Sequence, residues 1–421
     1  MLLRALLRSS SALVGLPLVV VFVLLALQDD LTKFVTANYW PSAIDTATFA
    51  LPFLATACAA LGAWEGARLD RGQVLKQTAV RTPLGITLPL LVPVVATGMI
   101  GLLTAGILTA AASGASPSLT GTSVLLVAFL LFSANALIGY LVGRRWPAVV
   151  SVPVALVGAF IANAYPVSWE ILWIRHLVGG GLRNCCAVDQ VLDPRALWSA
   201  ATFALALITA AVITIQFPRN PKSWAIAPLV ALVGIAAGSY FAQDLGPDPV
   251  RDRPRTALVC ENGASVRTCL WPEVQDPAAL RKEVQTAVTR LRAAGVTVPS
   301  TLTMAARPAG GEAKLGVLTD DTPDHVPAGV ASGLLPEYPA CASDGPYPAA
   351  AALEPVAAWL MLTAGAPRET VSAQVAPEAA ALALKVKDQP QKVQRGWYAT
   401  NTRAMQSCTA KPTLVIGKET T

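Results

Sequence analysis

The chain has 421 residues, of which 54% are hydrophobic and only 14% are charged, and its mean hydropathy is +0.52. Ordinary soluble domains carry roughly 25% charged residues, so this composition excludes a soluble protein and predicts an integral membrane protein in contact with a lipid bilayer. The net charge is +6, but residues 243–421 contain 18 basic and 18 acidic residues and are neutral. The basic excess therefore belongs to the loops between the apolar runs, and we infer no nucleic-acid partner.

Seven apolar runs precede residue 243, and each approaches the roughly 20 residues that a helix needs to cross a bilayer. The first follows Arg4 and Arg8, as the apolar part of a secretory signal peptide does, but no small-x-small cleavage site separates it from Asp29. We therefore expect an uncleaved first helix, and an α-helical polytopic membrane domain of about seven transmembrane helices in residues 1–243. The runs are 11–27, 46–64, 84–111, 122–142, 148–165, 196–216 and 224–242.

The loop charges predict the orientation of these helices, because basic residues are retained on the cytoplasmic side. With the N-terminus in the cytoplasm, the outside loops hold only Lys33, Arg175, Arg183 and Arg195. The inside loops then hold ten basic residues, namely Arg4, Arg8, Arg68, Arg71, Lys76, Arg81, Arg144, Arg145, Arg219 and Lys222. We therefore expect a multi-pass protein of the plasma membrane, with a cytoplasmic N-terminus and an extracellular C-terminal domain.

The cysteines give an independent indication of the same orientation. Only Cys58 lies in a membrane run, and the other six fall on the outer, oxidising face, where disulfides form. Six free thiols in a reducing compartment are the alternative. The adjacent Cys185 and Cys186 either form a vicinal disulfide or bond to sulfurs elsewhere. The disulfide candidates are Cys185, Cys186, Cys260, Cys269, Cys341 and Cys408.

A short hairpin is predicted around Asn262 and Gly263, between two short strands. If these two residues were the whole turn, Cys260 would face Ser265, so a bond from Cys260 to Cys269 requires a longer loop. We favour that local bond, which leaves Cys341 and Cys408 as a long-range pair.

The segment 64–83 concentrates charge between two apolar runs. Glu65, Arg68 and Arg71 follow one another at intervals of three and would project from one side of a short, charged, interfacial helix that is interrupted near Gly72. A solvated loop whose arginines only orient the protein is the alternative. Thr82 followed by proline is typical of a helix start and is expected to begin the third membrane helix.

The stretch WEGARLDRGQVLKQTAVRTPL resembles the loop after the second helix in ABC-2-type transporter permeases. The resemblance implies that Glu65, Arg68 and Arg71 form the ATPase-coupling element, which contacts a cytoplasmic ATP-binding-cassette ATPase subunit. It also implies a homo- or heterodimer of permease subunits. The segment 165–195 is similar to the interfacial half-helices between helices five and six of that family, and its apolar patch holds Trp169, Ile171, Leu172, Trp173 and Ile174. A seventh helix and the domain after it depart from the usual six-helix fold.

Residues 244–421 are expected to form an extracytoplasmic, disulfide-containing α+β domain. Its clearest helix begins at Asp276 and ends at Gly295, with an apolar stripe formed by Leu280, Val284, Val288 and Leu291. Further helices are expected near 349–364, 375–386 and 390–407. The sequence DDTPDH at 320–325 either binds a cation or forms a solvated turn.

No catalytic motif occurs in the chain, so we expect no enzyme activity, no metal site and no cofactor. The sequence lacks the P-loop GxxxxGK[ST], HExxH, GxSxG and Cys/His spacings typical of zinc sites. The first hypothesis is a permease subunit that exports a substrate using a separate ATPase. The alternative is a membrane-anchored extracytoplasmic binding or sensing protein without transport activity. A third hypothesis, an extracytoplasmic enzyme, has only His325 as a candidate base.

Overall fold

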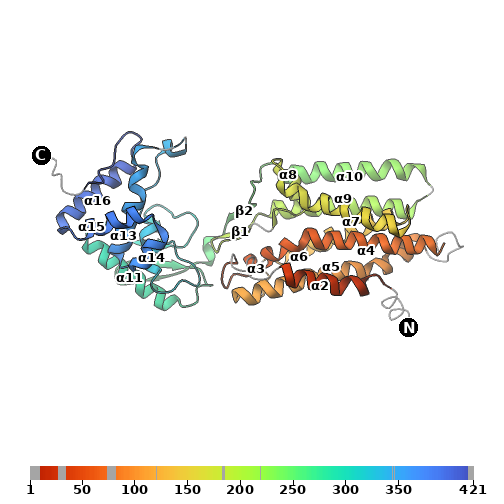
Figure 1. The fold of residues 1–421 in the computed structure, drawn as a ribbon, viewed down its shortest axis with the longest axis horizontal. Coiled ribbons are helices and arrows are strands. Elements are labelled where there is room, and N and C mark those ends of the chain that lie inside the picture. The colour runs from red at the N-terminus through yellow and green to blue at the C-terminus, as the bar shows by residue number, and fades with distance from the viewer. Residues whose placement is uncertain are drawn as a thin grey trace. The chain divides into compact units, whose positions relative to one another are not determined.

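The computed structural model describes residues 10–26, 35–73, 82–119, 121–182, 185–218, 220–343, 345 and 347–415 (Figure 1). The chain divides into two compact units, Met1–Arg251 and Asp252–Thr421. The sequence suggested a boundary at residue 243, whereas the first unit continues to Arg251. The reason is a small two-stranded sheet in which β1 (Gln190–Leu192) pairs with β2 (Val250–Asp252), so that the chain beyond the last membrane helix remains attached to the first unit.

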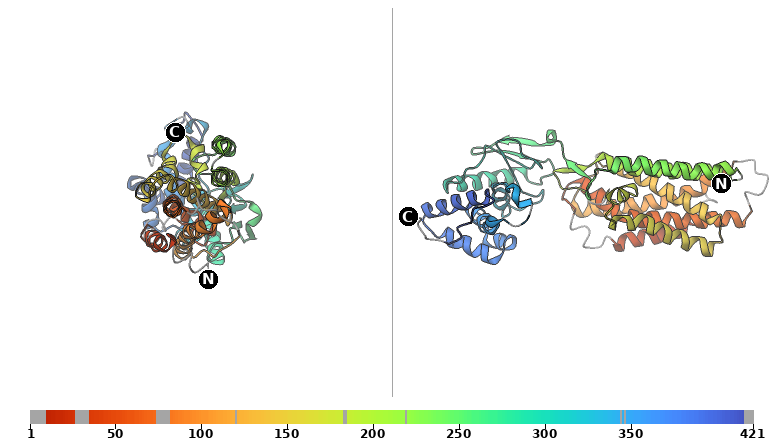
Figure 2. Two further views of the ribbon diagram at one scale, coloured as in Figure 1. Left: turned by 90° about the vertical axis from the view of Figure 1, so that its right-hand side faces the viewer. Right: turned by 90° about the horizontal axis from the view of Figure 1, so that it is seen from above.

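Six helices in the described part of the first unit are long and apolar enough to cross a membrane. They run side by side along one direction (Figure 2). The first of these spans, Trp40–Arg71, consists of α3 (Trp40–Ala47), the short 3-10 helix η2 (Thr48–Ala50) and α4 (Leu51–Arg71). The other five are α5 (Pro83–Ser113), α6 (Ser123–Gly143), α7 (Ala148–Ala164) continued by η4 (Tyr165–Ser168), α9 (Pro194–Gln216) and α10 (Pro221–Ala242).

The first apolar run of the sequence forms a shorter helix, α2 (Ala12–Ala26), of 15 residues. At 1.5 Å per residue it measures about 22 Å, which is less than the roughly 30 Å of a bilayer's hydrocarbon core. Residues 1–9 and 27–34 on either side lie outside the described residues, and so do Arg4, Arg8 and Lys33. Six of the seven expected spans are therefore found, and a seventh crossing by α2 stays a prediction.

Three of the membrane helices begin with the same local signal, a capping side chain followed by proline. Thr82 Oγ1 accepts a hydrogen bond from the Gly85 amide (3.1 Å) at the start of α5, as the sequence predicts. Asp193 caps α9 and Asn220 caps α10 in the same way. Proline suits the first helical position because its missing amide hydrogen would have no partner there.

The centre of the membrane unit is a contact between α4 and α6 in which backbone meets backbone. Gly62 and Gly66 on α4 lie against the backbone of α6, and Gly139 and Gly143 on α6 lie against the backbone of α4. A Cβ added at any of the four would overlap a carbonyl oxygen of the opposite helix. Small residues spaced four apart allow such close approach, which drives helix association in lipid. We call these four glycines the glycine seam.

Exposed aromatic side chains lie near both ends of the membrane helices. Trp64 near the end of α4, Trp146 before α7 and Trp224 near the start of α10 mark one end. Tyr165 after α7 and Trp198 near the start of α9 mark the other. Tryptophan and tyrosine concentrate at the two membrane–water interfaces, so these residues support insertion of the helices across a bilayer.

The second unit is a mixed α/β region with a small sheet in the order β3-β4-β5-β6. β3 pairs antiparallel with β4, and β4, β5 and β6 are parallel. The strands are β3 (Val259–Asn262), β4 (Arg267–Leu270), β5 (Thr301–Thr303) and β6 (Glu312–Lys314). The helices are α11 (Pro277–Ala293), α12 (Val326–Ser332), α13 (Leu353–Ala364), α14 (Arg368–Gln374), α15 (Pro377–Lys387) and α16 (Gln391–Met405).

Helix α11 connects the parallel strands β4 and β5 and forms as the sequence predicts. Asp276 Oδ1 accepts a hydrogen bond from the Ala279 amide (2.9 Å), and Gly295, with a φ of +90°, follows the helix end. The whole predicted apolar stripe is buried, namely Leu280, Val284, Val288 and Leu291. The helices expected near 349–364, 375–386 and 390–407 correspond to α13, α15 and α16, whereas α12 and α14 were not expected.

Candidate functional site

The charged segment that follows the second apolar run is the last part of α4. The helix continues without interruption through Arg71, and Gly72 caps it with its amide on the Arg68 carbonyl. Residues 64–71 are thus helical, and the alternative of a solvated loop is wrong for them. They continue the second span, however, and do not form the separate short interfacial helix that the sequence predicts; the helix ends at Arg71, beside the expected interruption at Gly72. Residues 74–81, with Lys76 and Arg81, lie outside the described residues.

The three residues of the expected coupling element lie in different environments. Glu65 is completely buried, the side chain of Arg68 is 36% exposed, and Arg71 is exposed. Glu65 Oε2 forms an ion pair with Arg68 Nη2 at 2.7 Å. The structure thus brings Glu65 and Arg68 together, and only the two arginines are available at the surface.

Glu65 also binds the start of helix α2, a contact that the sequence pattern did not reveal. Its Oε1 accepts a hydrogen bond from the Ser11 amide at 2.7 Å, and Ser11 Oγ donates to the Leu61 carbonyl at 3.4 Å. A carboxylate at a helix N-terminus compensates the unpaired amides and the positive end of the helix dipole. A serine at the start of the first apolar run is a recognisable helix-start signal, but its partner lies 54 residues away.

The end of α4 is also held by α5 and α6. Gly66 lies against the Tyr140 backbone, and the Tyr140 hydroxyl forms a 2.9 Å hydrogen bond with Thr87 Oγ1 of α5. The Arg144 guanidinium lies 5.9 Å from the centre of the Tyr140 ring. Arg68 and Arg71 therefore project from a point where four helices, α2, α4, α5 and α6, are bound to one another.

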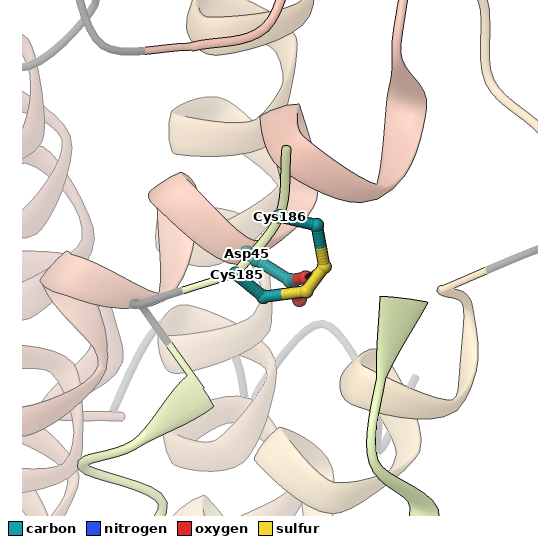
Figure 3. Close-up of side chains that lie close together, drawn as sticks. All are labelled: Asp45, Cys185 and Cys186. Carbon is teal, nitrogen blue, oxygen red and sulfur yellow. Dashed lines mark hydrogen bonds between the residues drawn. A yellow bond between two sulfur atoms is a disulfide. The ribbon is translucent and has the colours of Figure 1, made fainter. Parts of the chain in front are cut away.

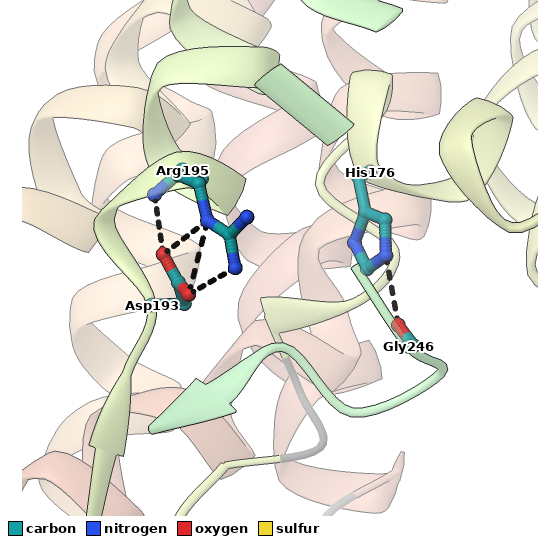
Figure 4. Close-up of polar contacts among 4 residues, drawn as sticks. All are labelled: His176, Asp193, Arg195 and Gly246. Atoms are coloured by element: carbon teal, nitrogen blue, oxygen red, sulfur yellow. Dashed lines mark hydrogen bonds and ion pairs between the residues drawn. The ribbon is translucent and has the colours of Figure 1, made fainter. Parts of the chain in front are cut away.

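At the other end of the helices, the segment after α7 contains the short helix α8 (Leu172–Leu177). Trp169 and Ile171 of the expected interfacial patch are exposed there. His176 is buried, and its Nε2 lies 3.0 Å from the Gly246 carbonyl oxygen (Figure 4). Burial lowers the pKa of His176. This contact ties α8 to the chain that follows α10.

A second connection at this end involves Asp193, the cap of α9. The Arg195 guanidinium donates to both oxygens of its carboxylate, with Nη2 at 2.9 Å from Oδ2 (Figure 4). Burial acts to raise the pKa of Asp193, but the hydrogen bonds from Arg195 outweigh it and lower that pKa. The Asp193 amide donates to the Pro249 carbonyl at 2.7 Å, which aligns β1 with β2.

The adjacent cysteines form a vicinal disulfide, one of the two possibilities that the sequence left open. Both are buried, and they lie directly beside the carboxyl group of Asp45 (Figure 3). Asp45 is 1% exposed and belongs to the first span, which begins at Trp40. The apolar run in the sequence begins at residue 46, so the pattern places Asp45 outside the membrane helix and does not identify it. An ionisable residue inside a span is the signal that would have identified it.

The disulfides of the second unit follow the predicted pairing. Cys260 pairs with Cys269 across β3 and β4, and Cys341 with Cys408, with Cα separations of 4.0 and 5.9 Å. The hairpin loop consists of residues 263–266, because Asn262 pairs with Arg267, so the longer loop that this bond requires is present.

The acidic sequence at 320–325 forms a turn. Asp321 Oδ2 accepts a hydrogen bond from the Leu318 amide at 2.7 Å, and its Oδ1 lies 3.5 Å from His325 Nδ1. Among the described residues, the only group of three potential metal ligands is Asp45 with Cys185 and Cys186. The solvated turn is therefore favoured over the cation site at 320–325.

Residues 268–408 match the family model of a domain of unknown function, DUF7224. The match lies within the second unit and contains the Cys341–Cys408 disulfide. The chain matches no curated protein and no solved structure. It is thus a multi-helix membrane protein with a C-terminal DUF7224 domain.

Proposed function

We propose that the chain is the permease subunit of an ATP-binding-cassette transporter and exports a substrate with energy from a separate cytoplasmic ATPase subunit. The observation that carries the proposal is the end of α4. It resembles the coupling segment of ABC-2-type permeases, and it presents Arg68 and Arg71 from a point that is fixed to three other helices. Two such chains, alike or different, would form the transporter.

The number of spans supports placing the end of α4 and the DUF7224 domain on opposite sides of the membrane. Five candidate spans, α5, α6, α7, α9 and α10, follow α4 before β2 is reached. An odd number of crossings puts the two segments on opposite faces, whether or not α2 crosses. The basic residues near the α4 end, Arg68, Arg71, Arg144, Arg145 and Lys222, favour the cytoplasm for that face.

The contacts of Glu65 suggest how a force on the arginines would reach the membrane helices. A bound ATPase subunit that displaces Arg68 acts on Glu65 through their ion pair, and Glu65 is hydrogen-bonded to the start of α2. The α6 helix moves with α4 because the glycine seam leaves no side-chain layer between them. In this proposal Glu65 positions the helices, while Arg68 and Arg71 contact the partner.

Co-purification tests the proposal. The tagged full-length protein is isolated from its native membrane, and the recovery and ATP hydrolysis of any cytoplasmic ATPase bound to it are measured. Arg71→Glu is the informative variant because Arg71 is exposed, whereas a change at buried Glu65 would also disturb folding. We expect at least about a tenfold weaker association, equivalent to 1.4 kcal/mol.

Arg251→Glu is the matched control, because Arg251 is also exposed but lies beyond α10, at the opposite end of the unit. It should leave the association unchanged. Equal recovery of the ATPase with Arg71→Glu and Arg251→Glu would contradict the proposed contact.

The alternative is a membrane-anchored extracytoplasmic binding or sensing protein. The separate, disulfide-bonded second unit with its own family match favours it. If no ATPase accompanies the full-length protein, and the double variant Arg68→Glu, Arg71→Glu retains the complete cellular phenotype, this alternative replaces the permease.

A further inference from the structure

We propose that Asp45, Cys185 and Cys186 form a redox-controlled binding site for a thiophilic divalent metal ion of the zinc class. The site binds the ion when the cysteine pair is reduced and releases it when the disulfide forms. This inference is independent of the proposed transport function.

The ligand atoms are already close together. One carboxylate oxygen of Asp45 and the two cysteine sulfurs lie within 4.8 Å of one another. Cys186 Sγ and Asp45 Oδ2 are 3.4 Å apart. An oxygen and a sulfur that share a tetrahedral zinc ion lie about 3.5 Å apart, given bonds of roughly 2.0 and 2.3 Å. The carboxylate therefore needs little movement to coordinate an ion that is held by Cys186.

The state of Asp45 is the second observation that points to a ligand. The side chain is 1% exposed, and its Oδ1 has no hydrogen-bond partner among the residues that the structure describes. Buried polar atoms normally have a partner, and an orphaned carboxylate oxygen requires an explanation such as a bound ion. Figure 3 shows that the carboxyl group points at the two sulfurs.

The cysteines remain beside Asp45 without the disulfide, because other contacts hold their segment. Thr36 Oγ1 donates a hydrogen bond to the Cys186 carbonyl at 3.0 Å. The Tyr39 hydroxyl donates to the Gln190 carbonyl at 2.6 Å. Reduction therefore frees two thiols in a place that is already shaped by the surrounding chain.

The donor set selects the class of ion. Two sulfurs and one carboxylate suit zinc and related thiophilic ions, whereas calcium and magnesium take oxygen ligands. Three protein ligands leave the fourth tetrahedral position open.

Charge balance favours a divalent ion. Reduction adds two electrons and two protons to the disulfide, and the reductant is an external dithiol that becomes a disulfide. Binding of the divalent ion then releases the two thiol protons. The ion and its three ligands, Asp45, Cys185 and Cys186, together keep the single negative charge that the Asp45 carboxylate carries without the ion. The reverse step needs an external disulfide as oxidant, which takes up the two electrons and two protons and becomes a dithiol while the ion leaves.

Metal binding by the full-length protein in detergent tests the proposal. The protein is treated with a phosphine reductant, the reductant is removed, and equimolar Zn²⁺ is added in the presence of a competing chelator. Bound zinc is measured by mass spectrometry, and Cd²⁺ is used in parallel because its thiolate complexes absorb in the ultraviolet. The double variant Cys185→Ser, Cys186→Ser keeps the four cysteines of the second unit, so the difference from the unsubstituted protein isolates this site.

We expect the reduced protein to bind one more metal ion than the double variant, and the unreduced protein to show no such excess. Asp45→Asn should weaken this binding at least about tenfold. Cys58→Ser, a control for the buried thiol of α4, should leave it unchanged. Equal metal content in the reduced protein and the double variant would overturn the proposal.

If Asp45→Asn or the double variant fails to fold, Cys185→Ser alone is measured with Cd²⁺. A loss of the thiolate absorption of one sulfur supports the site, and an unchanged spectrum contradicts it.

Discussion

The glycine seam makes a strong prediction about stability, because the contact between α4 and α6 is made by backbone atoms. A Cβ on Gly139 would overlap the Ala59 carbonyl oxygen and lie 2.9 Å from the Ala59 Cα atom. Both neighbours are backbone, so neither can rotate away, and the two helices must separate. Such overpacking typically costs about 1–3 kcal/mol.

The matched control is Gly158→Ala in α7, where an added Cβ meets nothing within 4 Å. Alanine favours a helix over glycine by about 1 kcal/mol at either position, so this gain cancels in the comparison. We therefore expect Gly139→Ala to be less stable than Gly158→Ala by about 1–3 kcal/mol.

The assay is reversible unfolding in mixed micelles, with increasing mole fraction of a denaturing detergent and circular dichroism as the signal. Equal midpoints for the two variants would refute the close approach of α4 and α6. A lower midpoint for Gly158→Ala than for Gly139→Ala would refute it more strongly.

Three further predictions use the same unfolding assay or its equivalent for the second unit. Glu65→Ala should cost about 1–3 kcal/mol of stability, because the buried Ser11 amide loses its acceptor. Arg71→Ala should have little effect, and equal losses in the two variants would contradict the contact with α2. Cys341→Ser should destabilise the second unit by about 2 kcal/mol more than Cys260→Ser. The two disulfides have sequence separations of 67 and 9, and the larger loop gains more entropy in the unfolded chain when its disulfide is removed. The reverse order of stability in thermal unfolding would refute this. Burial lowers the pKa of His176, so the unfolded state binds a proton to this side chain more tightly than the folded state does. The contribution of His176 to the free energy of unfolding is therefore complete above the unfolded pKa of about 6.5 and falls as the pH drops below it. His176→Gln should remove this pH dependence.

The sequence predicted most of the helices because their signals are local. Long apolar runs identified six spans, and capping residues with proline placed the starts of α5 and α11. The Cys260–Cys269 bond was predictable for the same reason, since the two cysteines are only nine positions apart in the sequence. The crossing of the first apolar run is the exception, because α2 is shorter than the run and its flanks are outside the described residues.

The candidate sites were harder to predict because they depend on long-range contacts. Nothing in the sequence near Glu65 indicates that it caps the start of a helix 54 residues earlier. Nothing near Cys186 indicates that Asp45, 141 residues away, lies beside its sulfur. The glycine seam could have been found, because Gly62 and Gly66 form a GxxxG pattern, as do Gly139 and Gly143. The fold determines that these two GxxxG patterns pack together, and neither sequence pattern alone predicts its partner.

The glycine seam also determines how stiff this part of the molecule is. Helices separated by leucine or phenylalanine side chains can slide, because rotamer changes absorb small displacements. Gly62, Gly66, Gly139 and Gly143 have no side chains that could adjust in this way, so we expect α4 and α6 to move together as one rigid pair. Any bending that accompanies activity must therefore occur outside this pair, for example where α2 and α5 pack through longer side chains such as Val19, Leu54 and Leu61.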